Sequence, residues 1–129
     1  MYCLDTDVAI ANFRGDESIR ERLNYLSTGR LFVTPVTLCE LYRGTFLSGN
    51  LEKNKLLVDK LLERVSILNF DLPACEIFGR IYGILKQLGK LTQDSDLMIA
   101  SICLSNNVIL VTRNKKHFEN IKGLKVEEW

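Results

Sequence analysis

Short apolar runs alternate with longer helical segments along this chain, and this alternation limits its fold more than any other feature. Four runs are rich in β-branched and other apolar residues and have the length of buried strands: Tyr2–Leu4, Leu31–Val33, Ser66–Phe70 and Val108–Val111. A fifth run, Leu124–Val126, suits an edge strand. Because strands separated by helices are typical of an α/β fold, we expect a mainly parallel sheet of four to five strands.

The segments between these runs have helical periodicity and end at glycine or asparagine residues. The expected helices are Val8–Phe13, Glu17–Leu26, Val36–Leu47, Leu51–Arg64, Pro73–Leu88, Ser95–Ser105 and Lys115–Ile121. The segment Ser95–Ser105 is apolar on nearly every side, so we expect it to run through the core. Its amino end, with the acids beside it, would then lie at the bottom of a cleft.

Composition sets the scale of the protein and excludes several classes. With 129 residues, 47% of them hydrophobic, we expect one domain over residues 1–129 that buries its own core. No apolar run is long enough to span a membrane and no leader is evident, so we expect a cytoplasmic protein. A formal charge of +1 lacks the basic footprint of a tight nonspecific nucleic-acid binder.

Thiol and imidazole chemistry is not expected. The four cysteines are Cys3, Cys39, Cys75 and Cys103. They are widely spaced, and a single histidine, His117, is available to complete a zinc site. Because each cysteine has apolar neighbours, we expect small buried hydrophobes. His117 is expected to be a surface residue and not a catalyst.

Polar side chains follow two of the expected strands. Asp5 comes directly after the first strand, and Asn114 follows the strand Val108–Val111 by way of Thr112 and Arg113. In an open parallel sheet, ligands collect at the carboxyl ends of the strands where the strand order reverses. Asp5 and Asn114 would therefore face one crevice if these two strands are neighbours.

Further acids lie where helices begin or interrupt an apolar face. Asp94 and Asp96 precede the buried helix, and Glu40 interrupts a largely apolar helical segment. Carboxylates gathered in this way bind Mg²⁺ or Mn²⁺ through oxygen. One or two such ions can drive phosphodiester hydrolysis without a histidine or serine nucleophile. For Glu40, an ion pair with Arg43 is the structural alternative.

The other acids also have structural explanations. Asp5 can cap the following helix, a role that Thr6 or Asp7 could equally fill. Asp94 and Asp96 suit the first turn of a helix, where the macrodipole stabilises each by roughly 0.3–1 kcal/mol. The argument for a metal site therefore rests on the joint arrangement of the acids.

Five segments in order along the chain carry a resemblance to a known family: Leu4–Asp7, Val36–Leu41, Asp96–Ala100, Val111–Asn114 and His117–Trp129. The chain resembles the PIN-domain ribonucleases, and most closely the VapC-type toxins of prokaryotic toxin–antitoxin modules. The resemblance implies an α/β three-layer sandwich with helices on both sides of the sheet. It also implies an Mg²⁺-dependent endoribonuclease, with Mn²⁺ as a substitute, that cleaves RNA and acts as a toxin. The expected partners are a VapB-like antitoxin and a second copy in a homodimer or larger complex.

The same resemblance assigns roles to individual residues. The acids that match the catalytic, metal-binding acids of the family are Asp5, Glu40 and Asp96. Asn114 falls where many members carry a fourth acid, which leaves the second metal open, and Asp94 is an additional candidate ligand that could compensate. The expected supporting residues are Asn114, Thr6, Asp7 and Thr112. Asp7, where many relatives have asparagine, is expected to order the turn at Asp5.

Two other functions remain open. The segment Leu4–Val8 also fits the Asp-x-Asp start of haloacid-dehalogenase-type phosphatases, with Asp5 as nucleophile and Asp7 as acid/base. Against that reading, the later acids precede a buried helix and Glu40 has no role. A PIN fold that only binds RNA or protein is the second alternative, because Asn114 replaces an acid.

An apolar groove for the partner is also expected, on the helices that carry Leu23, Tyr25, Leu26, Leu47, Leu51 and Leu57. The structural alternative is that these residues simply fill the core.

Overall fold

A computed structural model describes all residues from 1 to 129 and contains one five-stranded sheet. The strands are β1 (Tyr2–Leu4), β2 (Leu31–Val33), β3 (Ser66–Ile67), β4 (Ile109–Val111) and β5 (Val126–Glu127). They lie in the order β3-β2-β1-β4-β5, and every neighbouring pair is parallel. The parallel α/β architecture expected from the sequence is therefore confirmed.

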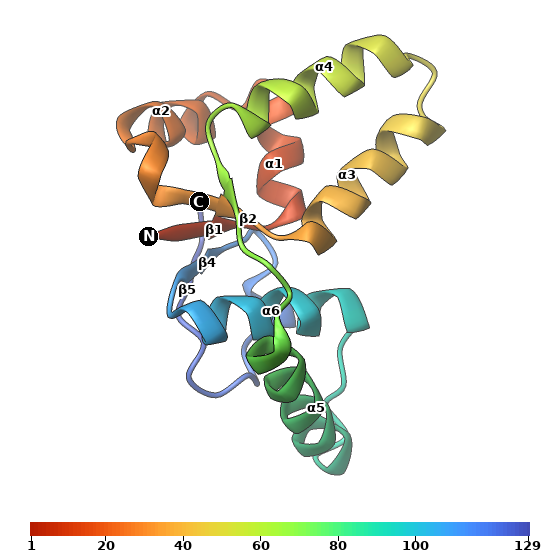
Figure 1. The fold of residues 1–129 in the computed structure, drawn as a ribbon, viewed down its shortest axis with the longest axis vertical. Coiled ribbons are helices and arrows are strands. Elements are labelled where there is room, and N and C mark those ends of the chain that lie inside the picture. Colours follow the sequence, from red (N-terminus) through yellow and green to blue (C-terminus); the bar gives the residue numbers. More distant parts are fainter.

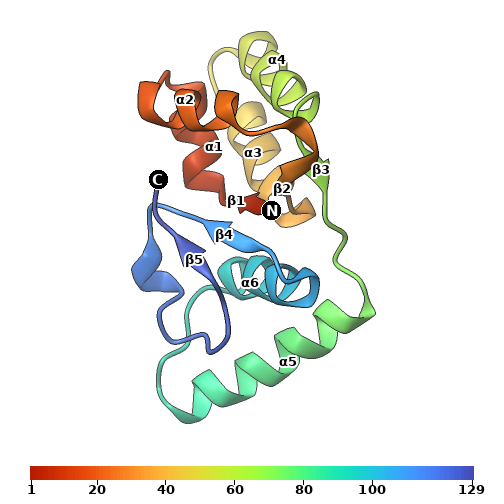
Figure 2. The same cartoon turned by 90° about the vertical axis from the view of Figure 1, so that its left-hand side faces the viewer.

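Helices cover both faces of this sheet (Figure 1). They are α1 (Thr6–Phe13), α2 (Glu17–Tyr25), α3 (Pro35–Leu47), α4 (Leu51–Leu62), α5 (Leu72–Gln87) and α6 (Asp94–Asn106), with 3₁₀ turns η1 (Thr28–Arg30) and η2 (Lys115–His117). Helices α1 to α4 lie on one face, and α6 lies on the other. Helix α5 packs on the outer side of α6 (Figure 2). The result is the expected three-layer sandwich.

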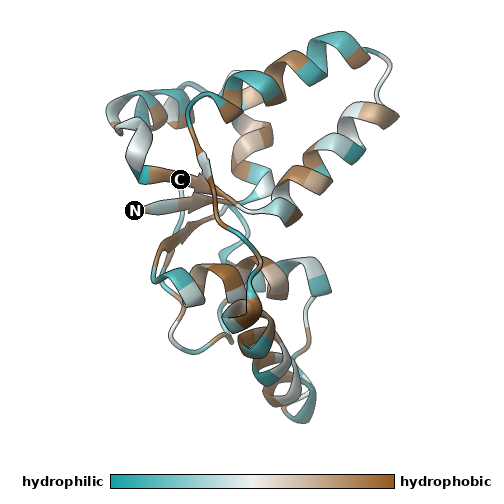
Figure 3. Ribbon diagram, in the orientation of Figure 1, coloured by the Kyte–Doolittle hydropathy of each residue, from teal (hydrophilic) through white to brown (hydrophobic).

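Each face of the sheet has its own core, because successive side chains of a strand point to opposite faces. Leu4 packs with α1 to α4, whereas Cys3 packs with α6 and α5. The middle of α6 is correspondingly hydrophobic, whereas both of its ends are hydrophilic (Figure 3). In α6 every residue from Ile99 to Cys103 is buried, so the expectation that this helix runs through the core is confirmed.

Strand pairing fixes where the site can form. The chain builds β2 and β3 on one side of β1, then returns to place β4 and β5 on the other side. The strand order therefore reverses between β1 and β4, where Leu4 lies opposite Val111. This confirms that the two strands preceding Asp5 and Thr112 are neighbours. Ligand sites in open α/β sheets lie at such a switch point, at the carboxyl ends of the strands.

Several expected boundaries are wrong at the periphery. The helix expected over Lys115–Ile121 is only the turn η2, because both Phe118 and Ile121 must be buried and the local hydrogen bonds join residues three apart. Strand β3 ends at Ile67 and not at Phe70, because β2 beside it ends at Val33. The edge strand lies at Val126–Glu127, where it pairs with β4.

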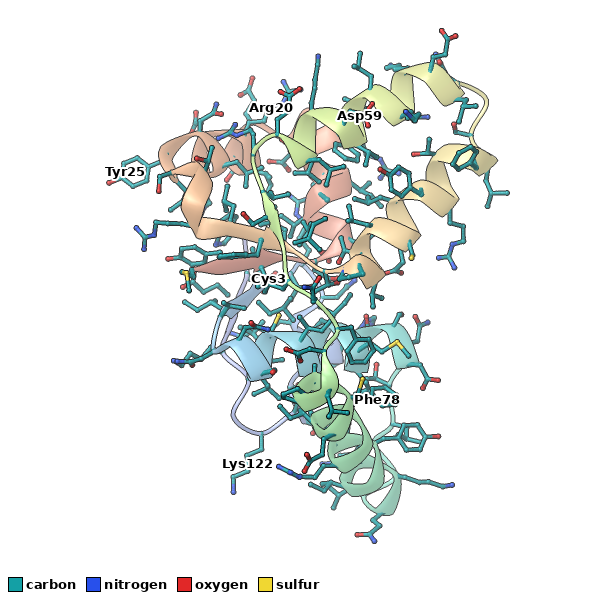
Figure 4. The ribbon with its side chains drawn as sticks, viewed as in Figure 1. Cys3, Arg20, Tyr25, Asp59, Phe78 and Lys122 are labelled. Carbon is teal, nitrogen blue, oxygen red and sulfur yellow. The ribbon has the colours of Figure 1, made fainter.

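The cysteine prediction is half correct. Cys3 and Cys103 are buried, with Cys3 at the centre of the molecule (Figure 4), whereas Cys39 and Cys75 are exposed and all four thiols are free. The exposed pair lies on α3 and α5, which fully bury only a few of their residues. No helix combines the length and apolar character needed to cross a membrane.

Candidate active site

Asp5 occupies the switch point between β1 and β4. Its amide donates to Val111 O at 2.9 Å, which continues the pairing of the two strands by one residue. The buried side chain caps α1, with Oδ1 accepting from the Thr6 amide at 2.8 Å and Oδ2 accepting from the Thr112 hydroxyl at 2.8 Å. The capping role proposed as the structural alternative is therefore real.

The environment of Asp5 opposes its negative charge. The pKa of its carboxyl is raised from 3.8 to about 6, chiefly by burial and also by the charges of Asp7 and Asp96, while the hydrogen bonds from Thr112 and Thr6 act in the opposite direction. No lysine, arginine or histidine forms an ion pair with Asp5. A buried carboxylate with acids as its charged neighbours is stabilised by a cation from outside the chain.

Glu40 reaches the same place from α3. Its Oε1 accepts a hydrogen bond from the Thr6 hydroxyl at 2.9 Å, so the carboxylate lies next to the residue that follows Asp5. The expected ion pair with Arg43 is long, at 4.0 Å, and the Arg43 side chain is 72% exposed. Exposed pairs of this kind contribute little to stability, so Arg43 does not account for the orientation of Glu40.

Asp96 lies in the first turn of α6 with its side chain only 14% exposed. Its Oδ2 contacts Nδ1 of His117 at 3.1 Å and accepts from the Thr92 hydroxyl at 3.4 Å, whereas its Oδ1 has no hydrogen bond. Because its charge contributes to the raised pKa of Asp5, the two carboxylates lie within electrostatic reach of each other. One oxygen of Asp96 is therefore free to take a ligand.

The loop after β4 joins the site through Asp7. The Oδ2 atom of Asp7 accepts from the Arg113 amide at 2.9 Å and from the Thr112 hydroxyl at 3.3 Å. Its Oδ1 atom is buried and has no hydrogen-bond partner. Thr112 in turn accepts from the Asn114 amide at 3.0 Å. Asp7 and Thr112 thus tie the β4 loop to the start of α1.

Two predicted residues stay at the margin. The side chain of Asn114 is exposed and makes no hydrogen bond, although its backbone bonds Thr112. Asp94 is the exposed first residue of α6 and makes neither a hydrogen bond nor an ion pair. The structure brings Asp5, Glu40 and Asp96 to one edge of the sheet, but it does not bring these two side chains into contact with them.

The donor set suits a hard divalent cation. The available ligands are carboxylate oxygens, including a buried Asp5, an unbonded Oδ1 on Asp96 and an orphaned Oδ1 on Asp7. Oxygen-only donors favour Mg²⁺ or Mn²⁺ over zinc. No three acidic, histidine or cysteine side chains lie close enough together to enclose an ion on their own. An ion here would therefore complete its coordination with water, as Mg²⁺ usually does.

His117 is the site residue that sequence reasoning missed. It is half exposed, as expected of a surface residue, yet its ring meets Asp96 from a position 21 residues later in the chain. No periodicity or spacing could have paired the two residues. The only signal was that His117 opens the last of the segments that carry the family resemblance.

A groove leads away from Glu40 between α1, α3 and α4. It has a volume of about 460 Å³ and is lined by Ile10, Phe13, Arg14, Glu40, Leu41, Gly44, Thr45, Lys53, Asn54 and Leu57. Of the residues expected to form a partner surface, Leu57 lines this groove and Leu23 is in the core. Tyr25 and Leu47 are 91% and 81% exposed, and Tyr25 projects from the end of α2 (Figure 4).

Comparison with known proteins gives a consistent result over the whole length. Residues 2–124 match the PIN domain family. The tRNA(fMet)-specific endonuclease VapC of Shigella flexneri is 33% identical, with 99% of this chain and 97% of that protein covered. The VapBC2 structure from Rickettsia felis, bound to a promoter DNA fragment, superposes with a TM-score of 0.94 at 29% identity, covering 99% of this chain and 98% of that one. The DNA-bound VapBC structure from Salmonella typhimurium gives 0.93 at 33% identity, with 99% and 97% covered.

Proposed function

This chain belongs to the PIN-domain family, and from that premise we propose that it is a divalent-metal-dependent endoribonuclease and the toxin of a toxin–antitoxin pair. The proposal is supported by full-length similarity to a protein named as a tRNA-specific endonuclease and to toxin–antitoxin complexes. The observation that carries it is the buried carboxylate of Asp5. This group lies at the strand switch point, next in the chain to Thr6, which bonds Glu40, and within electrostatic reach of Asp96, and it has no cationic side chain as a partner.

We assign the catalytic and metal-binding roles to Asp5, Glu40 and Asp96, with Mg²⁺ as the expected ion and Mn²⁺ as a substitute. When bound, such an ion supplies neutralisation of the phosphate and activation of the attacking water. The chain itself holds the ligands in place: the Thr6 hydroxyl orients Glu40, and the Thr112 hydroxyl orients Asp5. Asp7 acts as a support that fixes the loop after β4. Because Asp94 and Asn114 make no contact with these acids, we give them no direct ligand role.

The expected substrate is RNA, and a tRNA is the first to test because of the relative's specificity. The expected partner is a VapB-like antitoxin, as in the VapBC complexes that the chain resembles. The groove that begins at Glu40 is open to such a partner. We further propose that residues 1–129 act as one PIN-like domain in the cytoplasm, as a homodimer or in a larger complex with the antitoxin.

Cleavage by purified protein tests the enzymatic part. Wild-type protein with Mg²⁺ should cut an RNA that stays intact in the presence of a chelator, and Asp5→Asn should remove the activity. Asp59→Asn is the matched control, because Asp59 is an acid on α4 that pairs with Lys55 at 3.7 Å away from the site. Undiminished cleavage by folded Asp5→Asn would exclude the mechanism. RNA binding without cleavage by the wild type would favour the alternative of a binding module.

Growth of a bacterial host tests the toxin part separately. Expression of the chain alone should arrest growth, and co-expression of its neighbouring gene should restore it. Growth unaffected by active enzyme would contradict the toxin assignment and leave the nuclease assignment intact. The phosphatase alternative has lost its basis, because the PIN family match covers residues 2–124 and Glu40 bonds Thr6, the residue after Asp5.

A further inference from the structure

Asp96, in the first turn of α6, contacts a histidine that lies 21 residues later in the chain. Nδ1 of His117 lies 3.1 Å from Oδ2 of Asp96. We propose that His117 is a positioning residue, which donates its Nδ1–H to Oδ2 and fixes the Asp96 carboxylate so that Oδ1 is presented to a divalent cation. The inference rests on the proposed function and names a determinant of metal affinity at the same site.

The hydrogen bonds of Asp96 are divided between its two oxygens in a way that fits this role. Both donors, His117 Nδ1 and the Thr92 hydroxyl, meet Oδ2, while Oδ1 has none. The Thr92 contact is the longer, at 3.4 Å, so His117 is the principal restraint. Outer donors of this kind set the orientation of a carboxylate ligand, and their loss weakens metal binding without removing a ligand.

Local structure holds His117 where it can act. The turn η2 follows β4, and its hydrogen bonds run from His117 N to Asn114 O at 2.9 Å and from Phe118 N to Lys115 O at 3.1 Å. Phe118, next to the histidine, is fully buried and anchors the turn. The histidine is therefore carried by a segment that is fixed at both ends, although its own ring is half exposed.

The same loop also contacts Asp5, the buried acid of the site. At its beginning, the Thr112 hydroxyl donates to Asp5 and accepts from the Asn114 amide. At its end, His117 contacts Asp96. One short segment thus orients carboxylates from two elements that are far apart in sequence. An ion pair that served only stability would not need to lie on the same loop as Thr112, which bonds Asp5. Exposed pairs also stabilise a fold only weakly.

Three variants separate a positioning role from a structural one. His117→Ala removes the donor. His117→Asn keeps one, because the amide nitrogen of asparagine is the same number of bonds from the backbone as Nδ1 of histidine. Lys116→Ala is the control on the same turn, since Lys116 is exposed and has no contact with Asp96. Circular dichroism and thermal melting would first establish that all three variants fold as the wild type does.

Mn²⁺ affinity, measured by isothermal titration in the absence of RNA, is the decisive readout. We expect His117→Ala to weaken Mn²⁺ binding about 10–100-fold, the range for loss of an outer-shell partner. His117→Asn should recover most of this affinity, and Lys116→Ala should match the wild type. Wild-type affinity in His117→Ala would overturn the proposal. An equal loss in the alanine and asparagine variants would also overturn it, because the ring and not the donor would then matter.

RNA cleavage at increasing Mn²⁺ provides the second readout. Activity of His117→Ala should return to the wild-type level once Mn²⁺ is saturating, because the ligands themselves are intact. Activity that stays low at saturating Mn²⁺ would overturn the positioning role, since His117 would then act on the substrate. If the wild type neither binds Mn²⁺ nor cleaves RNA, the proposed function fails together with this inference. If it does both and His117→Ala is unchanged, the inference alone fails.

Discussion

The N-caps of α1 and α2 are the same residue type in opposite environments. Asp5 caps α1 and is buried, with neutral hydroxyl and amide donors, and burial raises the pKa of its carboxyl to about 6. Asp16 caps α2 through the Ile19 amide with its side chain 29% exposed, and its hydrogen bond with Arg113 lowers the pKa of its carboxyl below 3.8. Two neighbouring residues after β4 meet the two caps: Arg113 gives Asp16 a cationic partner, whereas Thr112 gives the buried Asp5 only a neutral hydroxyl. A capping motif is therefore compatible with either a purely structural acid or one that awaits a cation.

The largest contrast is expected in catalysis. Asp5→Asn should reduce RNA cleavage by more than about 100-fold, because loss of an outer-shell partner alone costs about 10–100-fold and Asp5 is proposed as a direct ligand. Asp16→Asn should leave the rate within a few-fold of wild type. Single-turnover cleavage with Mg²⁺ measures both. Similar losses in the two variants would mean that the two caps do not differ in function.

The next contrast concerns the stability of the metal-free protein. Raising the pKa of Asp5 from 3.8 to about 6 corresponds to ~3 kcal/mol of unfavourable ionisation at neutral pH. Asp5→Asn should therefore increase the free energy of unfolding at pH 7 by up to that amount. Urea denaturation in the presence of a chelator measures it. A destabilised but folded Asp5→Asn would show that the hydrogen bonds of Asp5 outweigh its desolvation.

The pH dependence of the two caps should have opposite signs. Because the folded-state pKa of Asp5 is raised, its stabilising contribution is complete below pH 3.8 and is lost as pH rises through about 6. For Asp16 the pKa is lowered, so its contribution is present above pH 3.8 and is lost as pH falls through the folded-state value. The stability difference between wild type and Asp5→Asn should thus grow between pH 4 and 7. A difference that is constant over this range would contradict the raised pKa.

Divalent metal should offset the unfavourable ionisation of Asp5 and have no such effect at Asp16. An ion that binds the folded state alone adds about 2.7 kcal/mol of stability at a concentration 100 times its dissociation constant. We expect Mn²⁺ to raise the melting temperature of the wild type and of Asp16→Asn, with little effect on Asp5→Asn. Equal stabilisation of all three proteins would indicate that the ion binds elsewhere.

The smallest effect is expected from Asp16→Asn in the absence of metal. Asparagine keeps the helix cap but loses the charge that pairs with Arg113, so stability should fall slightly at neutral pH. This change in stability has the opposite sign to that caused by Asp5→Asn. High salt should reduce the stability difference between Asp16→Asn and the wild type. Thermal melting at low and high salt checks both points.

Sequence reasoning found the parts of the fold that short-range patterns determine. The buried run Tyr2–Leu4 and the apolar helix that starts near Asp96 were predictable from hydrophobicity alone. The alternation of strands and helices predicted the parallel sheet, and Asp5 was expected at its carboxyl edge. The turn at Lys115–His117 was predicted as a helix, because periodicity does not distinguish an α-helix from a 3₁₀ turn that buries residues three apart.

What the sequence did not predict depends on contacts between distant elements. The hydrogen bond from Thr6 to Glu40 and the contact between His117 and Asp96 join segments that no local pattern connects. Cys39 has apolar neighbours along the chain but lies on the exposed face of α3, since apolar neighbours do not reveal which side of a helix is covered. The raised pKa of Asp5 likewise depends on burial, which follows only from the assembled layers.

Because β1 pairs with β4, the site can assemble only late in the synthesis of the chain. Asp5 is made at the start of synthesis, but its partner Thr112 lies 107 residues later. Contacts this distant in sequence form late in folding, because the loop between them must close first. During translation the acids of the site are therefore not held together until nearly the whole polypeptide has emerged. A chain that stalls before β4 would carry Asp5, Glu40 and Asp96 and yet be unable to cut RNA.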